Sequence, residues 1–213
     1  MRFSENDIQE LKNEVKRRLS EKRYNHTLGV LASAEKLAEL CSPDYLSQLQ
    51  AAALLHDITK EFTEDEHYAL LAEYGIFIPE SERPAATILH SITAPLMISR
   101  DFAKYATNTV MSATRNHTTG FPDMSINDKI IFLADFIEDN RTYPDSVALR
   151  SFVFQNMRDG QFDSNSKVLT EACLRAIEST INHLNASDKN IDPITLETKT
   201  ALTKEIQNFR IEN

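Results

Sequence analysis

The stretch that most constrains the fold of this chain runs from Ala51 to Asp57 and reads Ala-Ala-Ala-Leu-Leu-His-Asp. Its first five residues are small or apolar, which is typical of a buried helix that other parts of the chain must cover. The carboxylate of Asp57 stands at the end of that helix. Because an unpaired charge is costly to bury, Asp57 must either have a partner or bind a metal ion.

The rest of the chain shows the three- and four-residue spacing of apolar residues that indicates amphipathic helices, with no alternating strand pattern of useful length. Only four Gly and seven Pro occur in 213 residues, so tight turns and hairpins should be scarce. We therefore expect an all-α fold. Helices are predicted over residues 6–20, 23–41, 43–57, 64–74, 85–90, 93–102, 108–117, 126–137, 164–184 and 195–209. A further helix is predicted to begin at about residue 146.

Several helix ends carry recognisable signals. Ser42-Pro43 is typical of a helix start, with an N-cap hydroxyl before a proline at the first helical position. Thr63 to Glu66 has the form of a capping box, and Gly75 suits the position just after a helix. Ser125 to Asp128 is predicted to cap a helix that is apolar almost all round, so the Asp135 within it is a second acid that needs a partner.

The length of the chain is enough to bury a sizeable core. We predict a single domain over 1–213, with a metal-binding core over about 24–140 and C-terminal helices over about 146–210. No internal repeat or low-complexity segment divides the sequence.

The composition restricts which classes of binding partner and which cellular compartment we expect. The formal net charge of −9 argues against nucleic-acid or anionic-membrane binding, both of which favour a basic surface. Cys41 and Cys173 form no CxxC pair and are expected to be free thiols. The N-terminus lacks a signal-peptide core, and no window approaches 18 consecutive apolar residues. We expect a cytoplasmic protein.

Other imidazoles and carboxylates lie in similarly apolar, helical surroundings, and together they predict a metal site. The set is His26, His56, Asp57, His90, His117 and Asp135. Nitrogen and oxygen donors without a thiolate suit iron, manganese, zinc or nickel. Six ligands exceed what one catalytic ion needs, so we expect two ions that share a carboxylate, with Asp57 well placed as the bridge. Such a pair can hold a hydroxide nucleophile and stabilise a phosphoryl transition state.

The competing interpretation is that each histidine is simply a satisfied core or surface residue. His67 and His183, which lie on predicted helices among polar neighbours, illustrate it and are left out of the site. That interpretation explains a single histidine well, but it is much harder to apply to six candidate ligands that occur in one matching order along the chain.

Cations and hydroxyls near the predicted ligands are candidates for phosphate contacts. Lys60 lies one turn beyond Asp57, and Arg141 follows the Asp135 helix, where it could bind a phosphate bidentately. We expect these two to act in catalysis beside Asp57. Further substrate contacts are expected from Arg23, Thr118, Thr119 and Gly120. The alternative for each cation is a solvated surface charge.

The order His, His-Asp, His, His, Asp resembles the HD-domain phosphohydrolase superfamily. More narrowly, several motifs are similar to those of the YqeK family, over about 24–202: Leu-Leu-His-Asp at 54–57, Leu-His at 89–90, His-Thr-Thr-Gly at 117–120, Leu-Ala-Asp-Phe-Ile-Glu at 133–138 and Asp192-Pro193. The resemblance implies a single-domain HD helical bundle. It also implies that one ion is held by His26, His56, Asp57 and Asp135, and the other by Asp57, His90 and His117.

The YqeK family consists of symmetrical bis(5′-nucleosyl)-tetraphosphatases, which cleave diadenosine tetraphosphate into two ADP at a di-iron centre. The resemblance therefore implies two transition-metal ions, iron foremost, a dinucleoside polyphosphate substrate and ADP as product. Homodimerisation is left open. The sequence departs from the family at Ser91, where glycine is common, and at Asp139-Asn140, where Pro-Gly is usual.

Two alternatives stay open at this point. One is another HD activity, such as hydrolysis of nucleotides or cyclic dinucleotides. The other is a non-catalytic HD module that senses nucleotides. The intact set of ligands disfavours the second, because a module freed from catalysis has no reason to keep two buried acids unpaired.

Overall fold

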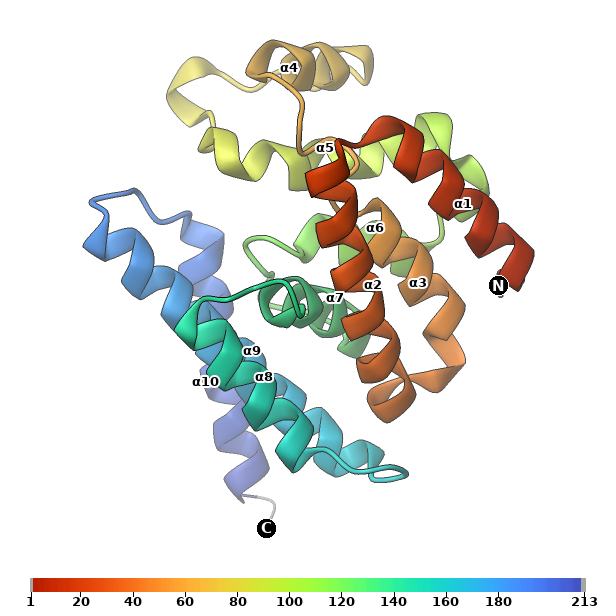
Figure 1. Ribbon diagram of the computed structural model, residues 1–213. Helices are drawn as coiled ribbons and strands as arrows, with labels where there is room; N and C mark the ends of the chain where they lie inside the picture. The colour runs from red at the N-terminus through yellow and green to blue at the C-terminus, as the bar shows by residue number, and fades with distance from the viewer. Residues whose placement is uncertain (1, 212–213) are drawn as a thin grey trace.

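The computed structural model describes residues 2–211, and within them it contains ten α-helices, three short 3₁₀ turns and no strand (Figure 1). The expected all-α class is confirmed. The helices are α1 Glu5–Arg18, α2 Glu21–Cys41, α3 Leu46–Leu55, α4 Glu64–Glu73, α5 Ala86–Asp101, α6 Asn108–Asn116, α7 Ile126–Ile137, α8 Pro144–Asn156, α9 Phe162–Ala186 and α10 Pro193–Ile211. The 3₁₀ turns are η1 Pro43–Tyr45, η2 Glu80–Glu82 and η3 Ala103–Tyr105.

Local capping chemistry fixes several helix starts as the sequence predicts. Thr63 and Ser125 each form a complete capping box, in which the hydroxyl accepts from the third residue of the helix and that residue's carboxylate accepts from the cap N–H. Gly75 follows α4 with a φ of 69°, a left-handed conformation that costs glycine little. These signals act within a few residues, so the sequence alone could reveal them.

Two predicted boundaries are wrong, for tertiary reasons. The separate helices predicted over 85–90 and 93–102 form one continuous helix, α5, which runs through Pro95. Its middle is buried, and Thr93 donates back to the Leu89 carbonyl, so packing holds the segment together. Ser42-Pro43 begins only the turn η1, because the Ser42 hydroxyl donates to Asn127 instead of capping; α3 starts at Leu46.

Two smaller differences concern a turn and a helix start. The stretch between the helices predicted over 64–74 and 85–90 contains the turn η2, and α9 begins at Phe162, two residues before the predicted start at 164, with Gln161 as the cap residue. The helix predicted to be apolar almost all round is α7. It is largely buried, but it also buries Asp128 and Lys129.

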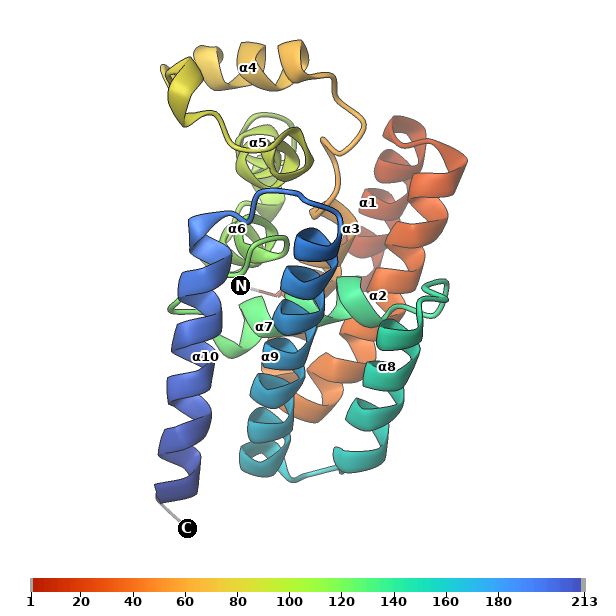
Figure 2. The same cartoon turned by 90° about the vertical axis from the view of Figure 1, so that its left-hand side faces the viewer.

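Helix α7 lies at the centre of the molecule. On one side it packs against α2, α3 and α6, and on the other side α8, α9 and α10 form a layer of nearly aligned helices (Figures 1 and 2). Helices α4 and α5 lie over the end of this arrangement, where α5 contacts α6. The assignment of the whole chain to one domain stays a prediction.

The predicted buried helix is confirmed by the packing around α3. Residues 51–55 are fully buried, and α2, α6 and α7 all contact this helix. The chain leaves α3 at His56-Asp57 inside the protein, so both polar side chains face other helices and not solvent. Within residues 2–211, no helix combines the length and the hydropathy that crossing a lipid bilayer requires.

Candidate metal centre

The structure brings all six predicted ligands together from five separate elements. His26 comes from α2, His56 and Asp57 follow α3, His90 lies in α5, His117 follows α6, and Asp135 comes from α7. Their donor atoms form three overlapping groups, and within each group all atoms lie within 4.8 Å of one another. The groups are His26–His56–Asp57, His56–His117–Asp135 and Asp57–His90–His117. Residues far apart in the sequence thus form one compact cluster of nitrogen and oxygen donors.

Asp57 stands in the middle of this cluster, and its two carboxylate oxygens face different imidazoles. Its Oδ1 lies 3.3 Å from Nε2 of His90 and 3.6 Å from Nε2 of His117. Its Oδ2 lies 3.4 Å from Nε2 of His56 and 3.7 Å from Nε2 of His26. One carboxylate therefore has a separate set of neighbours for each oxygen, which is the arrangement that a bridging ligand needs.

Backbone carbonyls fix the protonation of two of the imidazoles. The Nδ1–H of His56 donates to the Ala53 carbonyl, and that of His117 donates to the Thr114 carbonyl, each at 2.7 Å. A carbonyl oxygen can only accept, so Nδ1 carries a proton in each ring and Nε2 is the nitrogen left to face the cluster. Both Nε2 atoms face Asp57. This arrangement is typical of a metal-ligating histidine, in which one ring nitrogen binds the ion and the other donates a hydrogen bond that orients the ring.

The donor set fits a metal ion. Among the described residues, the buried Nε2 atoms of His26 and His56 make no hydrogen bond of good geometry and instead face carboxylate oxygens, Oδ1 of Asp135 at 3.1 Å and Oδ2 of Asp57 at 3.4 Å. A buried polar atom without a partner is unfavourable, and coordination of a cation by its lone pair would remove that cost. Imidazole and carboxylate donors without a thiolate suit iron, manganese, zinc or nickel. The cluster is therefore chemically suited to divalent metal.

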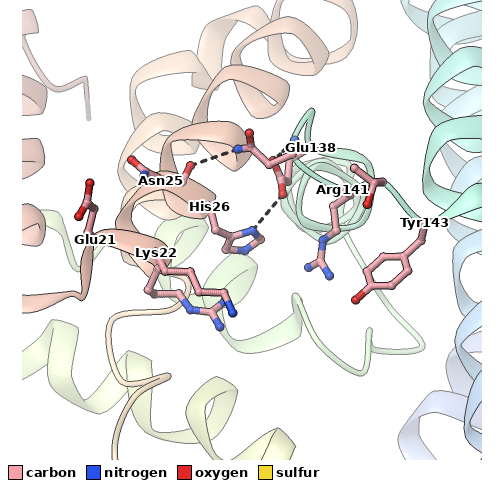
Figure 3. Close-up of a pocket in the computed structure, with 10 residues that line it drawn as sticks. Glu21, Lys22, Asn25, His26, Glu138, Arg141 and Tyr143 are labelled. Atoms are coloured by element: carbon pink, nitrogen blue, oxygen red, sulfur yellow. Dashed lines mark hydrogen bonds and ion pairs between the residues drawn. The ribbon is translucent and has the colours of Figure 1, made fainter.

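Glu138 is a residue of the site that the sequence reading missed. Its side chain is 2% exposed, and its Oε1 lies 3.3 Å from Nδ1 of His26, on the ring edge opposite the cluster (Figure 3). Its Oε2 accepts from the backbone N–H of Asn140 at 2.7 Å. Glu138 closes the motif at 133–138, one turn after Asp135, and that spacing was the available signal. Such a carboxylate orients a ligating histidine.

Gly29 makes room for this carboxylate. It lies one turn after His26 on α2, and a Cβ atom added there would stand 2.2 Å from Oε2 of Glu138. A side chain at this position would push the Glu138 carboxylate aside, so the present contact of Glu138 with His26 depends on glycine here.

Three predicted cations reach the cluster. Arg23 donates from Nη1 to Oδ2 of Asp57 at 2.8 Å. Arg141 donates to Asp135 twice, from Nη2 to Oδ1 at 2.6 Å and from Nε to the carbonyl at 3.0 Å. The Nζ of Lys60 lies 3.2 Å from both ring nitrogens of His90. Each of these cations contacts a predicted ligand, so none is a freely solvated surface charge.

The neighbouring charges hold the two acids of the cluster ionised. Burial by itself would raise the pKa of Asp57, but the surrounding imidazoles, His56 foremost, outweigh it and keep that pKa well below 3.8. The pKa of Asp135 is also well below 3.8, because His26 and Arg141 outweigh the effect of burial. Burial lowers the pKa of Lys60, although Asp57 and Asp135 oppose it.

The segment after α6 has three predicted contacts, which lie in different surroundings. The Thr118 hydroxyl is 3.0 Å from Nε2 of His90 and 3.1 Å from Nε2 of His117, so it belongs to the cluster. The hydroxyl of the buried Thr119 donates to the Gly120 carbonyl. Gly120 has a φ of 69° and packs tightly against Thr198 of α10. Roles of Thr119 and Gly120 toward a substrate stay predictions.

A cavity of about 710 Å³ opens beside His26. It lies between the first turns of α2 and the segment after α7, and its lining includes Lys22, Arg23, His26, Glu138, Arg141 and Tyr143 (Figure 3). The cluster is thus open to a cavity on the side of His26, and three cationic side chains line that cavity.

The two histidines left out of the site lie elsewhere. His67 is buried, contrary to the polar surroundings that its neighbours in the sequence suggest, and its Nδ1 is 2.8 Å from the Thr93 hydroxyl. It is a core histidine with a hydrogen-bond partner. His183 is exposed on α9. Neither belongs to a group of donor atoms that could hold a metal among the described residues.

Comparison with known proteins gives three concordant findings. Residues 23–139 match the model of the HD domain family. The chain is 32% identical over 195 residues to the symmetrical bis(5′-nucleosyl)-tetraphosphatase of Halalkalibacterium halodurans, covering 90% of this chain and 94% of that protein. It is 31% identical to the enzyme of the same name from Staphylococcus aureus, covering 87% and 98%. An HD superfamily hydrolase from Clostridium acetobutylicum shares the fold, with a TM-score of 0.79, 23% identity and coverage of 96% and 100%.

Proposed function

The chain belongs to the HD domain family, and we propose that it is a metal-dependent phosphohydrolase that cleaves dinucleoside tetraphosphates symmetrically. Diadenosine tetraphosphate would give two molecules of ADP. The names of the relatives from Halalkalibacterium halodurans and Staphylococcus aureus support the substrate class. The cluster around Asp57 supplies the chemistry that such a reaction needs.

One observation carries the two-metal part of the proposal. Because Oδ1 and Oδ2 of Asp57 face separate pairs of imidazoles, the carboxylate can serve two ions at once. We assign His26, His56, Asp57 and Asp135 to one ion, and Asp57, His90 and His117 to the other, with iron as the first candidate. A bound pair of ions supplies an activated water and stabilises charge on the phosphoryl group.

The surrounding side chains would position the substrate. We assign phosphate contacts to Lys60 and Arg141, because each lies against a predicted ligand and carries a positive charge that can pair with a phosphate. Arg23 and the Thr118 hydroxyl reach the same space. Positioning and charge stabilisation dominate phosphoryl transfer, so these groups contribute to the rate without forming a covalent bond.

The position of cleavage should be set by which phosphorus the cluster holds. The bridging oxygens of a tetraphosphate are leaving groups of broadly similar quality, so intrinsic reactivity does not select the central bond. If an inner phosphorus lies over the cluster, a nucleoside diphosphate leaves in line, and ADP is the sole product of diadenosine tetraphosphate.

The test is product analysis in oxygen-18 water with metal-loaded protein. We expect ADP alone, with one labelled ADP for each unlabelled one and the label at the terminal phosphate. Early formation of AMP and ATP in equal amounts would contradict symmetrical cleavage even with both metals bound. Absence of turnover in fully loaded protein that still binds nucleotides would favour a sensing module. Turnover of mononucleotides or cyclic dinucleotides alone would favour another HD activity.

The compartment and the partners are part of the same proposal. Both cysteines are buried free thiols, and the formal charge is −9, so we place the enzyme in the cytoplasm, acting on a small anionic substrate and not on nucleic acid or membrane. Association into a homodimer stays a prediction that sedimentation can measure.

A further inference from the structure

A second cavity, of about 460 Å³, adjoins the cavity beside His26. It lies between the start of α8 and the last turns of α9, and its volume falls in the range usual for small-ligand sites. Arg141 and Tyr143 line both cavities. The two spaces thus meet at one cation and one aromatic ring, which lie side by side in Figure 3.

The two cavities differ in chemistry. The first presents Lys22, Arg23 and Arg141, which suit the phosphates of the proposed substrate. In the second, Arg141 is the one Lys or Arg side chain of the described lining. Phe136, Leu184 and the ring of Tyr143 supply apolar surface there, and Asp145 and His183 supply polar groups. The Ser179 hydroxyl donates to Asp145 and the Thr180 hydroxyl to the Ala176 carbonyl, so both offer a ligand only acceptor lone pairs. Flat apolar surface with a few hydrogen-bonding groups suits a nucleoside better than a phosphate.

Tyr143 is presented to this space as an open platform. Tyr143 is 67% exposed, so a face of its ring is open to a stacking partner. Its backbone is held extended at φ −62° and ψ 136°, as the residue before a proline must be, because Pro144 starts α8. A ring on a restricted backbone loses little freedom when a base stacks on it.

We propose that the second cavity is the nucleoside subsite, in which a base stacks on Tyr143 while its diphosphate passes Arg141 toward the metal cluster. The proposal rests on the proposed function and deepens it. It assigns base recognition to the junction of α8 and α9, where every lining residue except Phe136 lies outside the matched HD segment at residues 23–139.

The test compares two ligands that share a diphosphate and differ in the nucleoside. Affinities of ADP and of inorganic pyrophosphate are measured by calorimetry on the metal-loaded full chain, without turnover. The wild type should bind ADP at least tenfold more tightly. Tyr143→Ala should weaken ADP binding roughly five- to hundredfold, as the loss of one base–aromatic stack does, and leave pyrophosphate unchanged. Tyr143→Phe should keep the preference for ADP.

A second variant acts by filling the cavity, so the test does not depend on one substitution. Leu184 is half-buried in the last turn of α9, and Leu184→Trp should lower ADP affinity at least tenfold while sparing pyrophosphate. Phe162→Ala is the matched control, because Phe162 is 45% exposed at the far end of α9 and should change neither affinity. Circular dichroism checks the fold of each variant.

Three outcomes would overturn the subsite: a wild type without preference for ADP, equal losses for both ligands in the variants, or no loss in either variant. The proposed function fails separately, because it fails when loaded protein does not hydrolyse diadenosine tetraphosphate. An intact preference for ADP over pyrophosphate in such a protein would leave the subsite standing.

Discussion

The two sides of the Asp57 carboxylate are built differently. On the Oδ2 side, which comprises His26, His56 and Asp135, the side chains of His26 and Asp135 are 14% and 22% exposed and a cavity opens beside them. On the Oδ1 side, which comprises His90 and His117, the corresponding side chains are 2% and 1% exposed. The Oδ2 side is thus accessible, and the Oδ1 side is enclosed.

Each side has one histidine that a local backbone carbonyl orients: His56 on the Oδ2 side and His117 on the Oδ1 side, each by the carbonyl three residues earlier. The Oδ2 side differs in its second histidine, because His26 contacts the carboxylate of Glu138 from the end of the α7 segment, in space left by Gly29. The position of His26 therefore depends on tertiary packing, and the Oδ2 side should be weakened by changes at Glu138 that leave the Oδ1 side intact.

The largest expected effect comes from removing the carboxylate that both sides share. Wild-type protein purified without oxygen should carry close to two transition-metal ions per chain, and Asp57→Ala should lose both ions or all turnover. Metal analysis with an activity assay measures this. Asp57→Asn, which keeps the shape, should behave in the same way, because an amide cannot bridge as a carboxylate does.

His67→Ala is the matched control for Asp57, because His67 is equally buried and bonds only within the core. It should retain metal and turnover. A loss as large as that of His117→Ala would contradict the separation of ligands from core histidines. Full activity at one ion per chain under metal excess would contradict the two-sided cluster.

A smaller effect is expected from the cations, one on each side. Lys60→Ala, near His90, and Arg141→Ala, near Asp135, should each lower kcat/KM about ten- to hundredfold. The reason is that a charge-assisted contact contributes roughly 1.5–3 kcal/mol. Metal content should not change in either variant. Rates within twofold of the wild type would show that neither side chain handles substrate.

The next prediction separates the two sides directly. Glu138→Gln keeps an acceptor for Nδ1 of His26 but removes the charge, so we expect about tenfold weaker binding of one ion and unchanged binding of the other. Metal titration followed by spectroscopy or calorimetry resolves the two sites. An equal loss of affinity for both ions would mean that the two sides do not bind metal independently.

The smallest effect is a difference in titration between the sides of the metal-free protein. Burial lowers the pKa of His26, but Asp135 and Asp57 outweigh it and raise that pKa above 6.5. For His90, burial and the nearby His117 lower the pKa well below 6.5. On acidification, His26 should therefore take up its proton before pH 6.5 is reached, and His90 far below it. NMR of the ring protons measures both.

The two shifts also have opposite signs for stability. The contribution of His26 is fully present below pH 6.5 and is lost as the pH rises through its raised pKa. His90 opposes folding below pH 6.5, and this cost disappears as the pH rises above that value. Coincident titration of the two rings would show that the sides share one electrostatic environment.

The sequence by itself determined the class of the fold and most of its helices. Apolar spacing and capping groups such as Thr63 and Ser125 act within a few residues, so their effect can be read along the chain. It also identified Asp57 and the five side chains that the structure gathers around it, because a buried carboxylate at the end of an apolar helix needs a charged partner or a metal ion. Their ligation of metal stays a prediction.

Only the tertiary structure decided which distant groups meet. It joined two predicted helices into α5 and gave the Ser42 hydroxyl to Asn127. It also paired the buried Lys129 of α7 with Glu205 of α10 at 2.6 Å, and it set Glu138 behind His26. Such contacts depend on how helices cross and which faces they bury, and no spacing along the chain encodes this.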